Sequence, residues 1–316
     1  MDIIEFAEKQ GYALYPVQKV ILKLIYGLEL DDTEKFDVKL HWQWTEGMPF
    51  TEKDYVDYLT QKDRLRGWEP GEEAKIVAAS MGRRSGKSTL QVLIALFEVY
   101  RKMQTCSTEK GDRDSRHLMM IGPTLQMSKS LFHAFQAEAE SSVLRELISR
   151  RTGEKYSFGE GGYPVEVLVR SGLAKALRGI SNKVTFVEEF AHFPLGSSEE
   201  TWLCISPQAD IGNKLMLFSS PGRDATTFRK VWKEKRRCRN HLSFRIPTWE
   251  IVPSLDRDQL ARLQKNGHAS FDTEWGAEFL TRVEVPIRET LLEQIKEQAA
   301  ERGLTVEDLL YEKLHQ

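Results

Sequence analysis

Ser80-Met-Gly-Arg-Arg-Ser-Gly-Lys-Ser-Thr89 joins an apolar run at residues 76–79 to a segment whose apolar residues recur at helical spacing up to Val99. A strand, a tight polar loop and a helix in this order are the context that a phosphate-binding loop needs. The pattern therefore predicts a nucleoside triphosphate site. The alternative is a chance Gly-Lys-Ser sequence in an ordinary loop, and the flanking strand and helix argue against it.

The residue types in this loop indicate separate roles. Gly82 and Gly86 let the backbone curl so that its N–H groups face a phosphate, and Lys87 reaches the terminal phosphates. Ser88 can supply a hydroxyl to Mg²⁺, and the positive end of the following helix points at the anion. The pattern G-x-x-x-x-G-K-[ST] has one departure, because Met81 stands where the first glycine is usual. The residues expected to contact the nucleotide here are Gly82, Arg83, Arg84, Ser85, Gly86, Lys87, Ser88 and Thr89.

Length and composition set broad limits on the function. The 316 residues suffice for one large α/β domain or two smaller ones, and 41% hydrophobic and 29% charged residues are ordinary for a globular protein. A formal net charge of −2 means that any contact with nucleic acid must come from a local patch. The three cysteines, Cys106, Cys204 and Cys238, lack metal-ligand spacing and indicate reduced thiols. No apolar run approaches the length of a membrane span.

Further strands and helices alternate along the chain. Residues 117–121 form an apolar run that ends in Gly-Pro-Thr124 and precedes a helical pattern. This alternation predicts parallel strands joined by crossover helices. Valines at 165, 167 and 169 alternate as in a hairpin or an edge strand. Residues 31–70 are polar, rich in tryptophan and without clear periodicity, which we interpret as an insertion or lid.

A second motif of the site ends the sequence Lys183-Val-Thr-Phe-Val-Glu-Glu189, an apolar strand followed by two acids. Glu188 can hold Mg²⁺ through water, and Glu189 can orient and deprotonate an attacking water. Aspartate is usual at the first of these positions, so the longer side chain of Glu188 weakens the metal assignment. The alternative is a strand that leaves two solvated carboxylates at its end.

Three polar side chains outside these motifs complete the expected nucleotide site. Gln18 follows Pro16 at the head of a helical pattern, and its amide can both donate to and accept from adenine. Without a phosphate loop downstream, a glutamine on a helix surface would be the better interpretation. Ser219 and Ser220 follow an apolar strand at residues 214–218. Because open α/β sheets bind ligands at the carboxyl ends of their strands, these hydroxyls are candidates to sense the γ-phosphate.

A dense basic segment occupies residues 226–245. Such a face can neutralise the phosphates of nucleic acid, although a solvated helix face fits the same pattern equally well. The candidate nucleic-acid contacts are Arg229, Lys233, Arg236, Arg237 and Arg239.

In order and spacing, these segments resemble the ATPase domain of tailed-bacteriophage terminase large subunits, over residues 10–280. The resemblance implies a RecA-like P-loop ATPase of the α/β class, with a mainly parallel sheet flanked by helices and a lid subdomain at residues 222–280. It implies ATP and Mg²⁺ as cofactors, and a catalytic arginine. The candidate is Arg178 supplied by a neighbouring subunit, and Arg83 and Arg84 in the loop compete for the same role within one chain. The matching segments are Tyr15-Pro-Val-Gln18 (adenine motif), residues 82–88 (Walker A), residues 121–124, Leu177-Arg-Gly179, residues 184–189 (Walker B) and Phe218-Ser-Ser-Pro221 (coupling motif).

The same resemblance implies a motor subunit that translocates double-stranded viral DNA into procapsids. Its implied partners are double-stranded DNA, the portal protein, the small terminase subunit and further copies of the chain in a pentameric ring; a separate nuclease subunit is also compatible. The implied location is the host cytoplasm, at the procapsid portal. Two alternatives stay open: a helicase-like DNA remodeller, and a packaging adaptor that binds nucleotide without efficient turnover. Met81 and Glu188 favour the adaptor.

The tail at residues 281–316 differs from the family, whose members usually continue into an RNase H-like nuclease domain. We expect no nuclease domain here, because so few residues cannot form one. The tail is expected to be a small helical unit that resembles a ribbon-helix-helix fold, with a strand at 283–287, a helix at 289–302 and a second helix from Val306. Glu284 and Pro286 would face outward and suit DNA poorly, which favours dimerisation or a helical cap.

Overall fold

The chain folds as two compact units, Met1–Leu280 and Thr281–Gln316. The computed structural model describes residues 1–105, 116–159, 164–177, 182–194, 196–211, 213–222, 226–234, 240–267, 269–279, 289–306 and 309. The first unit contains the sheet and the expected nucleotide motifs. In the second unit, the described helix is α12 (Glu289–Glu301), which lies where the first tail helix is expected.

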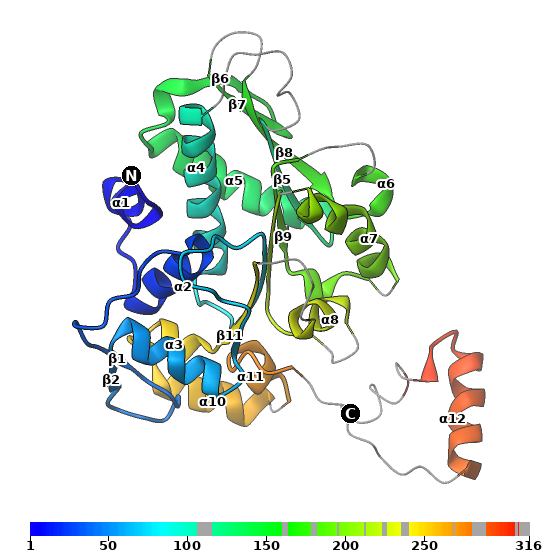
Figure 1. Ribbon diagram of the computed structural model, residues 1–316. Coiled ribbons are helices and arrows are strands. Elements are labelled where there is room, and N and C mark those ends of the chain that lie inside the picture. Colours follow the sequence, from blue (N-terminus) through cyan, green and yellow to red (C-terminus); the bar gives the residue numbers. More distant parts are fainter. Residues whose placement is uncertain are drawn as a thin grey trace. The chain divides into compact units, whose positions relative to one another are not determined.

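A nine-stranded sheet, counted over the described residues, forms the centre of the first unit (Figure 1). The strand order is β3-β11-β4-β10-β9-β5-β8-β7-β6. Strands β11, β4, β10, β9, β5 and β8 are parallel, whereas β3, β7 and β6 pair antiparallel with their neighbours. This confirms the expected α/β class with a mainly parallel sheet. The strands are β3 (Leu65–Arg66), β4 (Ile76–Met81), β5 (His117–Gly122), β6 (Ile148–Arg151), β7 (Lys155–Phe158), β8 (Val165–Ser171), β9 (Val184–Glu188), β10 (Lys214–Ser219) and β11 (His241–Ile246).

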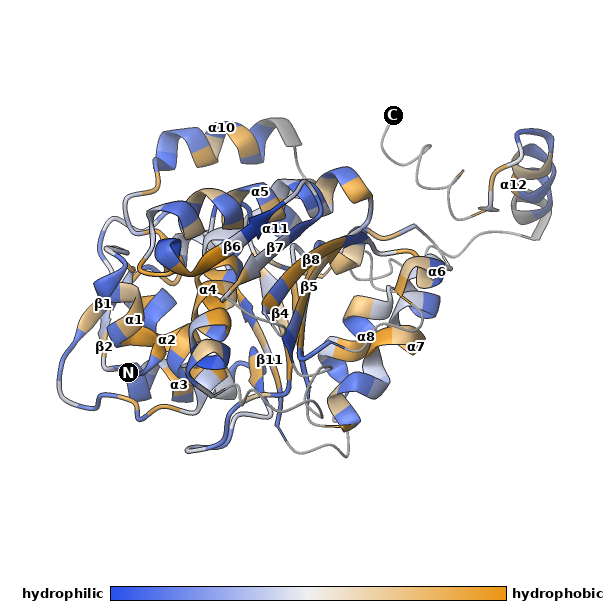
Figure 2. Cartoon of the chain, turned by 90° about the horizontal axis from the view of Figure 1, so that it is seen from above, coloured by the Kyte–Doolittle hydropathy of each residue, from blue (hydrophilic) through white to orange (hydrophobic). Residues whose placement is uncertain are grey.

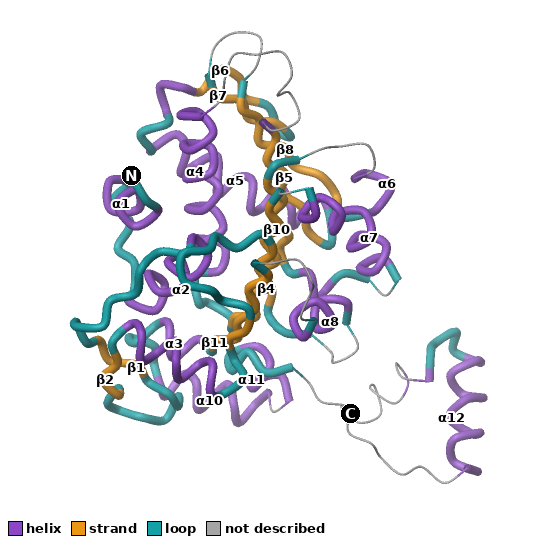
Figure 3. The backbone as a smooth tube through the Cα atoms, in the orientation of Figure 1, coloured by secondary structure: helices purple, strands orange, loops and turns teal. Residues whose placement is uncertain are grey.

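Helices cover both faces of this sheet (Figure 3). One face carries α1 (Ile3–Lys9), α2 (Pro16–Tyr26), α4 (Lys87–Thr105) and α5 (Leu125–Ser141), and the other carries α6 (Ala174–Leu177), α7 (Ser197–Asp210) and α8 (Thr227–Lys233). Two short 3₁₀ helices span Arg145–Leu147 and Phe190–His192. Where the chain is described, no helix combines the length and the apolar character needed to cross a membrane.

Alternation along the parallel strands produces two separate cores. In β4, Val77 and Ala79 join the core under α1, α2, α4 and α5, whereas Ile76 and Ala78 join the core under α7 and α8. Every residue of β4 is buried, which explains a continuous apolar run in a strand covered on both faces. Figure 2 shows the resulting hydrophobic strands between helices whose outer surfaces are polar.

The side of the sheet that ends in β11 and the edge strand β3 is extended by residues from both halves of the unit. It includes the hairpin β1 (Phe36–Val38) and β2 (Met48–Phe50), helix α3 (Glu52–Gln61), and the later helices α9 (Thr248–Ile251), α10 (Arg257–Gly267) and α11 (Ala269–Glu274). Arg64 donates two hydrogen bonds to the fully buried carboxylate of Glu250, at 2.8 and 2.7 Å, and Tyr55 donates a third to it at 2.7 Å. Trp42 packs edge-on against Phe271, with ring centroids 5.5 Å apart.

Two segments expected as lids contribute strands to the main sheet. The segment at residues 222–280, expected as a lid subdomain, contains β11, which pairs in parallel with β4 and is an inner strand. The residues 31–70, interpreted as an insertion or lid, contribute β3 to the sheet edge and pack against the segment that follows β11. The alternating valines at 165–169 lie in β8, which forms the expected hairpin with β7 but also pairs with β5 and is not an edge strand.

Candidate nucleotide-binding site

The loop expected to bind phosphate, called the phosphate loop below, connects β4 to α4. Strand β4 ends at Met81, and α4 begins at Lys87. Gly86 has φ +84° and Arg84 has φ +59°, so the loop needs left-handed backbone at two positions. The Lys87 ammonium donates hydrogen bonds to the carbonyl oxygens of Met81 (3.2 Å) and Gly82 (3.3 Å). The lysine therefore lies folded over the loop in which a phosphate is expected to bind.

Gly82 is required here for a reason that the sequence pattern does not contain. A Cβ atom at this position would lie 2.2 Å from the Thr248 hydroxyl oxygen and 2.4 Å from the Trp275 carbonyl oxygen. The Thr248 hydroxyl donates to the carbonyl oxygen of Arg83 at 2.7 Å, and the Thr248 N–H donates to Trp275 at 2.9 Å. The loop is thus packed against the segments at Thr248 and Trp275. A side chain on Gly82 would push the loop away from both segments.

Met81 fits the loop although glycine is usual at its position. Its side chain is fully buried in the core, and its backbone pairs with Ile246 of β11. Since Met81 is the last residue of a buried strand, a large apolar side chain packs there without entering the loop. Its carbonyl oxygen remains available to Lys87.

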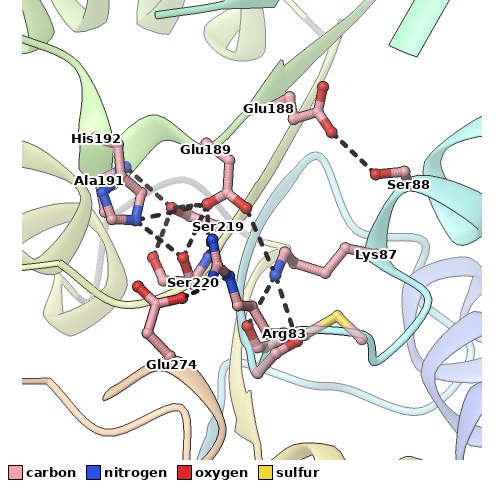
Figure 4. Close-up of polar contacts among 12 residues, drawn as sticks. Arg83, Lys87, Ser88, Glu188, Glu189, Ala191, His192, Ser219, Ser220 and Glu274 are labelled. Carbon is pink, nitrogen blue, oxygen red and sulfur yellow. Dashed lines mark hydrogen bonds and ion pairs between the residues drawn. The ribbon is translucent and has the colours of Figure 1, made fainter. Parts of the chain in front are cut away.

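The two motifs meet at the carboxyl ends of β4 and β9 (Figure 4). The Ser88 hydroxyl donates to a carboxylate oxygen of Glu188 at 2.9 Å, and the Lys87 ammonium lies 3.5 Å from Glu189. Glu189 has φ +50° and ψ +48°, a left-handed conformation that is uncommon for residues other than glycine. The two acids of the predicted pair therefore each contact a residue of the loop, Glu188 through Ser88 and Glu189 through Lys87.

The Ser88–Glu188 pair fits the expected Mg²⁺ site. Both residues offer oxygen atoms, which are the ligands that this cation prefers, and Mg²⁺ in nucleotide sites usually takes few protein ligands. Burial raises the pKa of Glu188 above its ordinary value, and the charge of Glu189 adds to this, while the Ser88 hydrogen bond and the Lys87 charge oppose it. A partly desolvated carboxylate of this kind is stabilised by a nearby cation.

Ser219 and Ser220 lie at the end of β10, the strand between β4 and β9, and both contact Glu189. One carboxylate oxygen of Glu189 lies 2.9 Å from the Ser220 N–H nitrogen, 3.1 Å from the Ser220 hydroxyl and 3.2 Å from the Ser219 hydroxyl. The serines expected to sense a phosphate thus hold the candidate base. Figure 4 shows them grouped around Glu189.

Gln18 contacts the phosphate loop directly. Its side chain is buried, accepts a hydrogen bond from the Tyr15 N–H at 3.1 Å and donates to the Ser85 carbonyl oxygen at 3.3 Å. These bonds use the amide oxygen and one of the two N–H hydrogens of the amide. The structure therefore excludes an exposed helix-surface glutamine.

The loop arginines point toward residues 274–275. Arg83 forms an ion pair with Glu274 at 3.0 Å, and the Arg84 guanidinium carbon lies 6.0 Å from the ring centroid of Trp275. Arg178, the other catalytic candidate, lies outside the described residues.

The predicted nucleic-acid residues are only partly described. Arg229 in α8 is half-buried, with its guanidinium carbon 4.5 Å from the ring centroid of Phe279, whereas Lys233 is exposed at the end of the same helix. Arg236, Arg237 and Arg239 lie outside the described residues.

Sequence reasoning missed three side chains that contact the motifs. His192 bonds to Ser220, Thr248 holds Arg83, and Glu274 pairs with Arg83. His192 stands three residues after Glu189, so its proximity was visible in the sequence. Thr248 and Glu274 belong to no motif, and only folding brings them to the loop.

Comparison with solved structures identifies the class of fold. The large terminase ATPase domain of Thermus phage P74-26 superimposes with a TM-score of 0.52 at 18% sequence identity, over 68% of this chain and 95% of that one. A single-site variant of the same domain has the same TM-score and identity and is covered to 96%. The bacteriophage HK97 large terminase has a TM-score of 0.48 at 12% identity, with 71% of this chain and 50% of that chain covered.

The first unit therefore has the fold of a large terminase ATPase domain, as the motif resemblance predicts. No protein-family model and no curated protein sequence matches the chain.

Proposed function

We propose that this chain is an ATP-hydrolysing motor subunit that translocates double-stranded viral DNA into procapsids. The observation that carries the proposal is the convergence of two motifs about 100 residues apart, through Ser88 and Glu188 at 2.9 Å and through Lys87 and Glu189 at 3.5 Å. A mainly parallel sheet places both motifs at the same edge, where such sheets bind ligands. The fold shared with a terminase ATPase domain supports the choice of motor over other P-loop enzymes.

In this proposal, binding of the nucleotide rearranges the Lys87–Glu189 pair. The loop N–H groups and the N-terminus of α4 attract the phosphates, and the Lys87 ammonium exchanges its carbonyl and carboxylate partners for phosphate oxygens. The Glu189 carboxylate oxygen that faced Lys87 is then free to accept a proton from an attacking water. Its other oxygen stays bound to Ser219 and Ser220, which keeps the carboxylate oriented.

Charge on the transferred phosphoryl group also needs stabilisation. Bound Mg²⁺ would supply part of it, and Ser88 and Glu188 are the residues that would hold the cation. A positive charge from an arginine completes such sites in many nucleotide hydrolases. We propose Arg178 of a neighbouring copy for this role, with Arg83 as the candidate within the same chain once its pair with Glu274 opens.

The proposed assembly follows from the proposed motor. Copies of the chain would form a pentameric ring at the procapsid portal in the host cytoplasm, and would contact the portal protein, the small terminase subunit and DNA. If Arg178 acts across the ring, subunits carrying Arg178→Ala mixed with subunits carrying Glu189→Gln should regain some activity. Absence of recovery at every mixing ratio would exclude this role.

Phosphate release with and without double-stranded DNA tests the enzymatic proposal. Glu189→Gln should bind ATP as the parent does but hydrolyse it about two to four orders of magnitude more slowly, because it lacks the general base. Lys87→Ala should lose ATP affinity instead. Glu200→Gln, at an exposed position of α7, is the matched control and should keep the parent rate. A Glu189→Gln protein with parent turnover would overturn the assignment.

The contact with DNA has its own test. Replacing Arg236, Arg237 and Arg239 with alanine should weaken DNA binding and reduce the slope of affinity against salt by up to about three, because each contact releases a counterion. Basal ATP hydrolysis should persist, whereas its stimulation by DNA should fall. Equivalent replacement of the exposed Lys9, Lys35 and Lys53 is the control. A triple variant that binds DNA like the parent across a salt series would place the contact elsewhere.

Two alternatives make different predictions. A helicase-like remodeller would separate strands of a duplex in the presence of ATP, which a displacement assay detects. A nucleotide-binding adaptor would bind ATP without efficient turnover. Met81 and Glu188 favoured the adaptor because they depart from the usual motifs. Met81 is a buried strand residue outside the loop, and Glu188 reaches Ser88, so neither departure argues against hydrolysis. We therefore favour the hydrolysing motor.

A further inference from the structure

We propose that His192 is a positioning residue for Glu189, acting through the hydroxyl of Ser220. This inference rests on the proposed role of Glu189 as general base. The imidazole Nε2 of His192 lies 2.9 Å from the Ser220 hydroxyl oxygen and 3.7 Å from a carboxylate oxygen of Glu189. Figure 4 shows the imidazole and the carboxylate on either side of the serine pair.

The local backbone brings the imidazole to this place. Glu189 adopts left-handed backbone and is followed by the 3₁₀ helix Phe190–His192. The His192 N–H donates to the Glu189 carbonyl oxygen at 2.9 Å, and the Ala191 N–H donates to the Ser219 hydroxyl oxygen at 3.1 Å. This turn reverses the chain after β9, so that the side chains of Glu189 and His192 both face the end of β10.

The serine hydroxyls near Glu189 each have a choice of hydrogen-bond acceptor. The Ser220 N–H donates to the Glu189 oxygen that faces the serines, at 2.9 Å, and no second acceptor is found for it among the described residues. The Ser219 hydroxyl proton can go to Glu189 at 3.2 Å or to the Ser220 carbonyl oxygen at 2.7 Å. The Ser220 hydroxyl proton can go to Glu189 at 3.1 Å or to the His192 imidazole at 2.9 Å. Each hydroxyl has one proton to donate, so each serine serves only one acceptor at a time.

The acceptor of the Ser220 hydroxyl proton depends on whether Nε2 of His192 carries a hydrogen. With a hydrogen on Nε2, His192 donates to the Ser220 oxygen, and the serine proton is directed to Glu189. Without that hydrogen, Nε2 accepts the serine proton and Glu189 loses this donor. Because a hydrogen bond restricts the direction of a carboxylate, the first arrangement holds the opposite oxygen of Glu189 toward the loop, where an attacking water would stand.

This role can be separated from a contribution to folding. The His192 side chain is 41% exposed, so the space left by truncating it is open to solvent and is not an enclosed cavity. Its described polar contacts are with Ser220 and Glu189, two residues of the site. A change at His192 should therefore affect the catalytic step and leave the stability of the unit close to that of the parent.

Steady-state ATP hydrolysis by the full chain tests the inference. His192→Ala should lower kcat about three- to tenfold, with KM within about twofold of the parent, because one orienting hydrogen bond is lost. The melting midpoint should not change. His192→Gln places an amide N–H near the position of Nε2 and should recover at least about half of the lost rate.

A double-variant comparison tests the route through the serine. If His192 acts by way of Ser220, adding His192→Ala to Ser220→Ala should cause no further loss of kcat. Independent, multiplied losses would overturn the inference, as would a parent-like kcat in His192→Ala or a glutamine variant as slow as the alanine variant. A parent protein without ATP hydrolysis would overturn the proposed function itself, and this inference with it. A hydrolysing parent with an unaffected His192→Ala variant would refute this inference alone.

Discussion

Replacing Gly82 with alanine should damage both the fold and the nucleotide site. The added Cβ would lie 2.2 Å from the Thr248 hydroxyl oxygen and 2.4 Å from the Trp275 carbonyl oxygen, closer than carbon and oxygen approach without a bond. The first neighbour is a side-chain atom already engaged with Arg83, and the second is backbone. Either the phosphate loop or the segment at Trp275 must therefore move.

The expected loss of stability in Gly82→Ala follows from the close contacts of the added Cβ. Overpacking of a filled site costs about 1–3 kcal/mol, and the upper end applies here because one of the two contacts is with backbone. In a unit of this size, about 3 kcal/mol corresponds to a fall of about 6–12 °C in the melting midpoint. ATP affinity should fall as well, since Gly82 carries one of the carbonyl oxygens that hold Lys87.

Thermal unfolding and ATP titration of the parent and three variants would check this. Gly153→Ala is the control, because a Cβ at Gly153 meets nothing within 4 Å and its φ is not positive. Adding Thr248→Ala to Gly82→Ala should restore only part of the stability, because the Trp275 carbonyl oxygen remains in the way. If Gly82→Ala matches the parent in melting midpoint and ATP affinity, the close packing of these segments against the loop is refuted.

Two further predictions concern buried charge. Glu250→Gln should lower the free energy of unfolding by about 3 kcal/mol, because it leaves the buried Arg64 guanidinium without its anion; a loss below about 1 kcal/mol in urea unfolding would contradict a buried pair. Glu188→Gln should raise the melting midpoint of the nucleotide-free protein at pH 7. The raised pKa of Glu188 means that the folded state favours the protonated form, so the stability it contributes is present at low pH and is lost as pH rises through the raised pKa. The increase in melting midpoint from glutamine should disappear in acid, because Glu188 is then protonated in both the folded and the unfolded protein. An equal increase at every pH would count against desolvation of the Glu188 carboxylate as the cause.

The local features of the site were predictable because short segments specify them. The sequence at residues 80–89 carries its own glycines, lysine and serine, and the left-handed backbone at Gly86 agrees with the role expected for that residue. The pairing of Glu188 with Ser88 and the helix at Lys87 also follow from motifs that are each a few residues long. The alternation of strands and helices along the chain predicted parallel strands joined by crossover helices, and the central strands of the sheet are parallel.

The association of distant segments was not predictable in the same way. Nothing in the periodicity of residues 241–246 shows that this stretch is an inner strand beside β4 and not part of the expected lid subdomain alone. The roles of Ser219 and Ser220 likewise depend on the position of β10 between β4 and β9, which makes them neighbours of Glu189. Strand order is decided by which apolar faces pack together, and many orders satisfy the same local pattern.

The amino-acid sequence alone thus determined which side chains stand in the loop at residues 80–89 and at the acid pair 188–189, and the chemistry expected of them follows from residues near one another along the chain. Only the tertiary structure showed that Thr248, 165 residues from Arg83, holds the loop and that Gly82 is needed for this close approach. It also showed that His192 meets Ser220 across two strand ends. Contacts of this kind depend on the spatial order of the strands, and the local sequence pattern does not encode that order.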